Sequence, residues 1–143
     1  MSDTHPHTLG RAHARIGETN YAVDLRAGGR HPLRSDEPAA LGGADAGPGP
    51  FSLVMSGLAA CTAITLRMYA QRKGWPLLAV EVDASITRNG DANQVERSIG
   101  LHGDLDEAQK AKLLEISEKT PVTLALKGGV AIHTRLREPG AAS

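Results

Sequence analysis

Hydrophobic positions in this chain follow two patterns. In several segments they alternate with polar positions, and in one long segment, predicted to be a helix, they leave no polar face. From Phe51 to Leu66 no residue is charged, and small residues are interspersed with large aliphatic ones. Pro50 suits a first helical turn and Gly74 suits a left-handed cap, so a helix is predicted over residues 50–73. A helix that is apolar all round is buried on every side. This helix is therefore predicted to be the centre of the fold.

The uncharged stretch raises the question of what covers it. A membrane span takes about 20 predominantly apolar residues. This stretch is shorter and contains Ser and Thr, so no membrane segment is expected. Small residues such as Gly57 and Ala60 let another backbone come close, and one short chain has little left with which to cover a helix on all sides. We therefore expect a second copy of the helix, from a second subunit, to supply part of the cover.

Period-two alternation predicts the strands. Gly28-Gly29 and Asn89-Gly90 are turn signals between such segments. The expected strands span residues 12–16, 21–26, 31–35, 78–88 and 94–105, with a last one at 130–136.

Two further helices are expected after the strand pair at residues 78–88 and 94–105. Asp106 can cap a helix over residues 107–118, and Pro121 begins a short helical or turn segment. Strands and helices do not alternate regularly along the chain, which is typical of an α+β fold rather than a doubly wound α/β fold.

Composition narrows the class of protein. The 143 residues are expected to form a single domain, with flexible tails at residues 1–9 and 139–143. Sixteen basic residues balance sixteen acidic ones, so the charge favours neither nucleic acid nor a membrane surface as partner. One cysteine excludes an internal disulfide and favours a reducing compartment. Since the first residues contain no apolar run typical of a signal peptide, we expect a cytoplasmic location.

Cys61, in the middle of the central helix, is the main candidate for chemistry. A lone cysteine is most often a small buried hydrophobic residue. A reactive thiol would need a cation beside it, and Arg15, Arg26 and Arg34 on the N-terminal strands could supply one. The sequence leaves open which of the three arginines does so.

The six histidines do not suggest a metal site. They stand at positions 5, 7, 13, 31, 102 and 133, and no pair has the i, i+4 spacing of ligands on one helix. No metal and no other cofactor is therefore expected.

Several segments resemble a known family. They are Asp36-Glu37-Pro38, Gly42–Pro50, Leu58–Ala70, Arg72–Leu77 and the later Glu118-Lys119-Thr120-Pro121-Val122. Together they are similar to the OsmC/Ohr family, in its OsmC-like branch, over roughly residues 20–137. The resemblance implies an intertwined homodimer, in which antiparallel sheets wrap two long central helices. It also implies the reduction of organic hydroperoxides in an oxidative stress response.

The resemblance implies roles for only some positions. In the family a cysteine at the position of Cys61 attacks the peroxide, a second cysteine forms a disulfide with it, and an Arg–Glu pair assists. Here Thr120 stands where the second cysteine is expected, and Phe51 and Ser52 stand where the glutamate is expected. These three residues become candidates for the pocket around Cys61, which alone carries over.

Three functions are compatible with these residues. The first is a peroxidase in which Cys61 becomes a sulfenic acid that an external thiol reduces. The second is a non-catalytic protein that binds or senses a small apolar ligand at the dimer interface near Cys61. The third is a structural protein with a merely buried cysteine.

Overall fold

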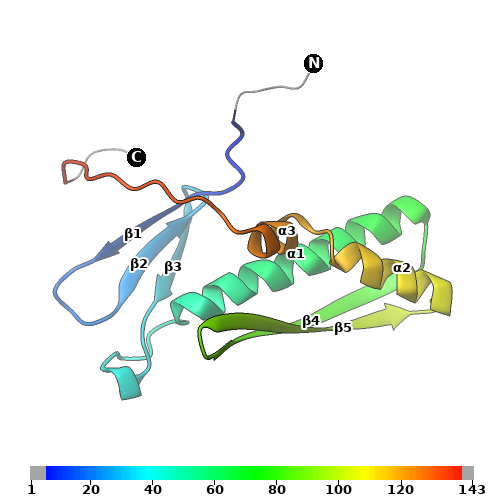
Figure 1. Cartoon of the computed structure of the whole chain (residues 1–143), viewed down its shortest axis with the longest axis horizontal. Helices are drawn as coiled ribbons and strands as arrows, with labels where there is room; N and C mark the ends of the chain where they lie inside the picture. The colour runs from blue at the N-terminus through cyan, green and yellow to red at the C-terminus, as the bar shows by residue number, and fades with distance from the viewer. Residues whose placement is uncertain (1–5, 140–143) are drawn as a thin grey trace. The chain divides into compact units, whose positions relative to one another are not determined.

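Two antiparallel sheets and three α-helices form residues 6–139, the part of the chain described by the structure, a computed structural model (Figure 1). This composition confirms the predicted α+β class. The elements are β1 (Ala12–Ile16), β2 (Val23–Ala27), β3 (His31–Ser35), the short 3-10 helix η1 (Ala39–Leu41), α1 (Pro50–Lys73), β4 (Leu77–Asn89), β5 (Ala92–Gly103), α2 (Glu107–Ser117) and α3 (Pro121–Gly128).

The described chain divides into two compact units. One combines the N-terminal part up to Ser56 with Ser85–Glu96, and the other combines Gly57–Ala84 with the part from Arg97 onward. In the first unit β1, β2 and β3 pair as an antiparallel meander, with Ile16 opposite Val23 and Val23 opposite Ser35. The expected glycine turn between β2 and β3 is present.

The loop between β3 and α1 is organised by the buried carboxylate of Asp36. This side chain accepts backbone N–H bonds from Glu37 at 2.7 Å, from Ala44 and Ala46 at 3.1 Å each, and from Tyr21 at 3.3 Å. Four donors on one carboxylate favour its charged form. The N–H of Ala46 contributes most, and together these bonds hold the pKa of Asp36 below its usual 3.8.

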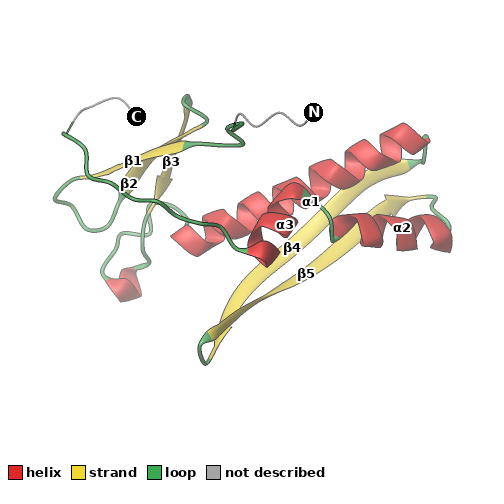
Figure 2. Ribbon diagram, turned by 45° about the horizontal axis from the view of Figure 1, so that its top comes forward, coloured by secondary structure: helices red, strands yellow, loops and turns green. Residues whose placement is uncertain are grey.

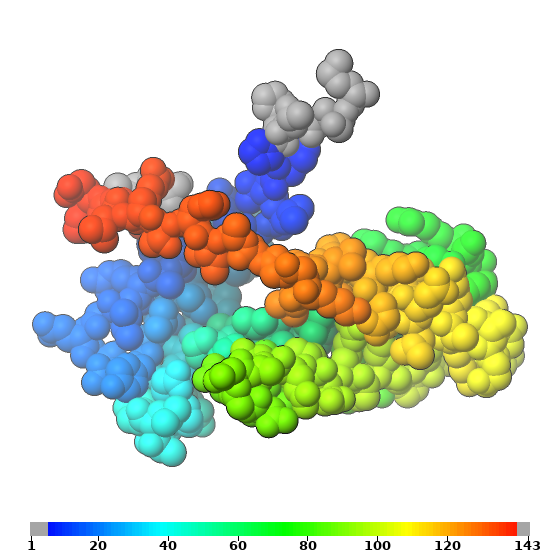
Figure 3. Space-filling model, in the orientation of Figure 1, coloured from blue at the N-terminus to red at the C-terminus, as the bar shows by residue number. Residues whose placement is uncertain are grey.

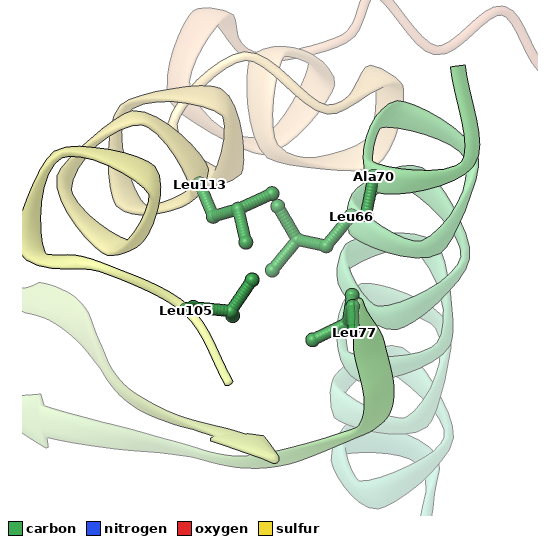
Figure 4. Packing of buried hydrophobic residues seen from close by; sticks show 5 residues of the cluster. All are labelled: Leu66, Ala70, Leu77, Leu105 and Leu113. Atoms are coloured by element: carbon green, nitrogen blue, oxygen red, sulfur yellow. The ribbon is translucent and has the colours of Figure 1, made fainter. Parts of the chain in front are cut away.

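In the second unit a small core joins α1 to the hairpin and to α2. Leu66 and Ala70 of α1 pack with Leu77, Leu105 and Leu113, and Figure 4 shows Leu66 and Leu113 pointing toward each other. The strands β4 and β5 run side by side (Figure 2), joined by a tight turn in which Gly90 has the left-handed φ of 65°. Asp106 caps α2 through a reciprocal bond with Gln109, as its position predicted.

Within one chain α1 has a buried face and an exposed face. Its buried positions recur every three or four residues, at Met55, Leu58, Thr62, Leu66 and Ala70. On the opposite face Ile64 is 54% exposed and Met68 is 53% exposed, in line with the exposed Gly57 and Ala60. Within a single chain one hairpin and two short helices cover only one stripe, so burial on every side stays a prediction that needs the expected second copy.

The predicted bounds of the long helix are confirmed, since α1 spans Pro50–Lys73. With 24 residues it is the one helix in the described chain that is long and apolar enough, by length and composition alone, to cross a membrane. No membrane segment is expected from the uncharged residues 51–66 alone, whereas the helix continues beyond Leu66 to Lys73. The core helix of a protein without any membrane segment meets the same two criteria, so the finding is weak evidence for a span.

The predicted last strand is absent from the described chain. Residues 130–136 follow α3 without pairing to any strand, and the segment lies at the surface in the space-filling view (orange to red in Figure 3). Val130, Ile132 and Leu136 are all exposed, Leu136 completely. Alternation alone cannot form a strand, since a strand needs an edge that accepts its hydrogen bonds.

Most of the two predicted tails lies outside the described residues. Only residues 6–9 and 139 of those tails belong to the described part, so their flexibility stays a prediction.

Replacing Asp36 by Asn should destabilise the protein at neutral pH. An amide has one acceptor oxygen and brings an N–H₂ group toward backbone donors. Because the folded pKa is depressed, the stabilisation is complete above the unfolded pKa and is lost as the pH falls through the folded one. Urea unfolding should therefore show a gap between wild type and Asp36→Asn that shrinks from pH 7 to about pH 3.

Asp24→Asn is the matched control for this carboxylate. Asp24 lies on β2 of the same unit and accepts from Arg34 at 2.9 Å, but both side chains are largely exposed. Such surface pairs contribute about 0–1 kcal/mol. An equal loss of stability in the two variants would contradict the organising role of Asp36.

Candidate functional site

Cys61 lies midway along α1, at the edge of its buried face. The preceding and following positions differ, since Ala60 is exposed and Thr62 is completely buried. Cys61 itself is half-buried and is a free thiol. Within residues 6–139 its sulfur has no hydrogen-bond or ion-pair partner, so the thiol is available to a ligand that reaches this edge of the helix.

The three arginines suggested as partners of the thiol all belong to the first unit, whereas Cys61 belongs to the second. Arg15 lies on β1, and Arg26 and Arg34 lie on β2 and β3, all with exposed side chains. Arg34 donates two hydrogen bonds to Asp24, at 2.9 and 3.1 Å. Their proposed role beside Cys61 stays a prediction.

The three residues suggested for the pocket lie in different environments. Phe51 and Ser52 are exposed on the first turn of α1, about 15 Å along the helix axis from Cys61 at 1.5 Å per residue. Thr120 is completely buried and caps the N-terminus of α3. The role of these three residues in a pocket around Cys61 stays a prediction.

A buried arginine that was not among the sequence candidates lies next to this part of α1. The Arg97 side chain, on β5, is only 11% exposed. Its Nη1 donates to the hydroxyl of Thr62 at 3.0 Å and to the hydroxyl of Thr123 at 2.9 Å. Arg97 therefore links α1, at the residue next to Cys61, with α3.

The second nitrogen of the same guanidinium reaches the end of α2. Nη2 of Arg97 donates to the backbone oxygen of Ser117 at 3.0 Å and lies 3.5 Å from a carboxylate oxygen of Glu118. A cation at a helix C-terminus is favourable because the last carbonyls have no partner within the helix. The planar fork of arginine suits such divergent acceptors, and a lysine could not reproduce it.

Glu118 balances the charge of Arg97. Its carboxylate also accepts from the ammonium of Lys127. This hydrogen bond, with smaller contributions from the charges of Lys127 and Arg97, holds the pKa of Glu118 below its usual value. Glu118 is therefore ionised at neutral pH.

Thr120 completes the polar cluster. Its hydroxyl lies 2.6 Å from the hydroxyl of Thr123 and accepts the Thr123 backbone N–H at 3.3 Å. Every buried side-chain N and O atom in the described chain has a partner, including those of this cluster. We name Thr62, Arg97, Ser117, Thr120 and Thr123 the Arg97 cluster.

The sequence carried a signal for Arg97 that alternation reasoning passed over. Arg97 stands in register with Val95, Ile99 and Leu101, on the face of β5 that turns inward. A charged residue on an apolar strand face is rarely buried without partners. That placement alone marks it as a candidate.

No metal site is formed by the described residues. Among them no three His, Cys, Asp or Glu side chains come together as possible ligands. His102 contacts a carboxylate oxygen of Glu81 at 2.8 Å on the surface of the hairpin.

Comparison with known proteins confirms the family resemblance. The model of the family described as OsmC-like protein matches residues 42–135. No curated protein sequence matches the chain.

Solved structures share the fold at low sequence identity. An OsmC-like protein from Mycoplasma pneumoniae is 18% identical, with a TM-score of 0.73 over 85% of this chain and 89% of its own. The organic hydroperoxide resistance protein OhrB of Bacillus subtilis is 21% identical, with a TM-score of 0.60 over 85% and 92%. An organic hydroperoxide resistance protein OsmC from Legionella pneumophila is 21% identical, with a TM-score of 0.62 over 87% and 93%.

Arg97→Met should lower the free energy of unfolding by about 3 kcal/mol, because it removes charge-assisted hydrogen bonds to three elements. Arg97→Lys should fall between this variant and wild type. The measurement is urea unfolding followed by circular dichroism.

Arg88→Met is the matched control for this loss. Arg88 lies on β4 and makes one exposed contact, from Nε to Asn93 at 3.3 Å. Its replacement should change stability by no more than about 0.5 kcal/mol. A comparable loss in both variants would mean that the buried contacts of Arg97 contribute little.

Proposed function

This chain belongs to the OsmC-like protein family, and we propose that it is a thiol-dependent reductase of organic hydroperoxides that works with a single cysteine. The observation that supports this most directly is the state of Cys61. It is a free, half-buried thiol on the central helix, at the position where the family resemblance places the peroxide-attacking cysteine. The solved structures that resemble this chain include proteins named for organic hydroperoxide resistance.

The first chemical step is a two-electron oxidation of the sulfur. The Cys61 thiolate attacks one oxygen of the peroxide, the O–O bond breaks, and the other oxygen leaves as an alkoxide that takes up a proton. The sulfur becomes a sulfenic acid and the hydroperoxide becomes an alcohol.

The second step needs a thiol from outside the chain, since Cys61 is the only cysteine. One external thiol condenses with the sulfenic acid, giving a mixed disulfide and water, and a second external thiol releases Cys61 and leaves as a disulfide. This requirement supports a reducing compartment such as the cytoplasm as the place of action.

We further propose that two copies of the chain form the working unit. The exposed face of α1 carries Gly57, Ala60, Ile64 and Met68 at helical spacing, with no charge among them. Solvated apolar residues in such a row are typical of an interface. A second α1, packed against this face, would complete the burial that the sequence pattern requires.

Peroxide should oxidise Cys61 without forming an intramolecular disulfide. After brief exposure of the reduced protein to tert-butyl hydroperoxide, intact-mass spectrometry should show the mass of one added oxygen, removable by dithiothreitol. Longer exposure without thiol should give the sulfinic acid, which dithiothreitol does not reverse.

Cys61→Ser is the control for this reaction and should take up no oxygen at this position under the same conditions. Turnover is followed as loss of hydroperoxide in the presence of an external dithiol. If the folded wild-type protein gains no oxygen at Cys61, the peroxidase proposal fails and the non-catalytic function replaces it.

Ala60→Glu tests the dimer and should convert it to monomer. On a monomer the new carboxylate would be solvated and change stability by no more than about 0.5 kcal/mol. In a helix–helix interface it would bury an unpaired charge at a cost of several kcal/mol. Light scattering at micromolar concentration should therefore show a dimer for wild type and a monomer for the variant.

Ala108→Glu makes the same substitution at an exposed position of α2, away from this face of α1, and should stay dimeric. A wild-type protein that is monomeric, or an Ala60→Glu protein that dimerises as wild type does, would refute the proposed packing.

A further inference from the structure

A cavity of about 320 Å³ lies in the second unit, between α1, β5 and α2. Five aliphatic side chains and one ammonium line it: Leu66, Ile99, Leu101, Lys110, Leu113 and Leu114. Leu66 and Leu113 are completely buried, whereas Leu114 is 60% exposed, so the cavity has an apolar floor and an accessible rim. Neither Cys61 nor any residue of the Arg97 cluster belongs to this lining.

Three of the lining residues come from one helix in a regular way. Lys110, Leu113 and Leu114 stand at i, i+3 and i+4 on α2, so they share one face of it. The volume of this open pocket lies at the lower end of the range for small-molecule sites, about 300–1,000 Å³.

The chemistry of the lining selects the ligand. It contains no acidic and no aromatic residue, so it offers neither a partner for a cation nor a surface on which a ring would stack. Lys110 reaches over apolar surface with its stem and keeps its ammonium at the rim. Its one recorded partner is Glu107, at 3.5 Å, and the Glu107 side chain is 94% exposed. A ligand anion can displace such a weak surface pair.

We propose that this cavity binds an alkyl chain that ends in a carboxylate, with the chain against the aliphatic floor and the carboxylate on Lys110. One carbon atom of an alkyl chain, with its hydrogens, takes up about 30 Å³, as a water molecule does in the liquid. The volume therefore holds a chain of roughly ten carbon atoms. The proposal is independent of the peroxidase proposal, because it requires neither a reactive Cys61 nor a turnover.

The test is the binding of decanoate to the full chain by isothermal titration calorimetry. Decanoate should bind wild type, and Lys110→Met should weaken it about tenfold, the loss expected for one charge-assisted contact. Decanol, which has no charge, should bind wild type and Lys110→Met equally. Leu114→Trp, which fills the rim without touching the floor, should weaken both ligands.

Lys112→Met is the matched control. Lys112 lies on the same helix and is paired with Glu115 at 3.4 Å, but it does not line the cavity. It should bind decanoate as wild type does, and so should Cys61→Ser. The proposal is overturned if wild type does not bind decanoate. Cover of the cavity by a second subunit would give this result. It is equally overturned if Lys110→Met and Lys112→Met behave alike, or if Leu114→Trp has no effect.

Discussion

One requirement governs this structure: a single short chain must bury a long apolar helix. Helix α1 has apolar residues on all sides over its first two-thirds, yet the hairpin and the short helices cover a single stripe. Stability then depends on how firmly that stripe is held, because the opposite face contributes nothing until something packs on it. The small residues on the exposed face, Gly57 and Ala60, favour another backbone as that partner, since they leave room for close approach.

The covered stripe is fastened by two different kinds of contact. Toward the C-terminal end of α1 it is aliphatic, with Leu66 and Ala70 against Leu113. One turn earlier it is polar, where Thr62 receives the guanidinium of Arg97. Hydrophobic contacts tolerate sliding, whereas a hydrogen-bonded fork fixes register. The Arg97 cluster therefore sets the rotation of α1 about its axis, and with it the direction in which Cys61 faces.

How much the sequence could predict follows from how local each signal is. The start of α1 at Pro50, its end before Gly74 and the cap at Asp106 depend on neighbouring residues, and the structure has all three where expected. The partners of Arg97 lie 20 to 35 residues away, so no local pattern could assemble them. The strand predicted at residues 130–136 is absent for a related reason. Their alternation is genuine, but a strand is defined by the edge it pairs with, and the described chain provides none.

The replacement of the family's second cysteine by Thr120 is best understood from the contacts of that residue. Thr120 caps α3, accepting the Thr123 backbone N–H, and its hydroxyl contacts a second hydroxyl at 2.6 Å. Threonine is a preferred N-cap residue and a hydroxyl both donates and accepts well, whereas a thiol does both weakly. At the position where the resemblance implies a redox group, this chain therefore has a structural one, and it takes part in the polar network that includes Arg97. Any oxidised form of Cys61 must then be resolved from outside, which makes the access of an external thiol to this edge of α1 the step on which turnover would depend.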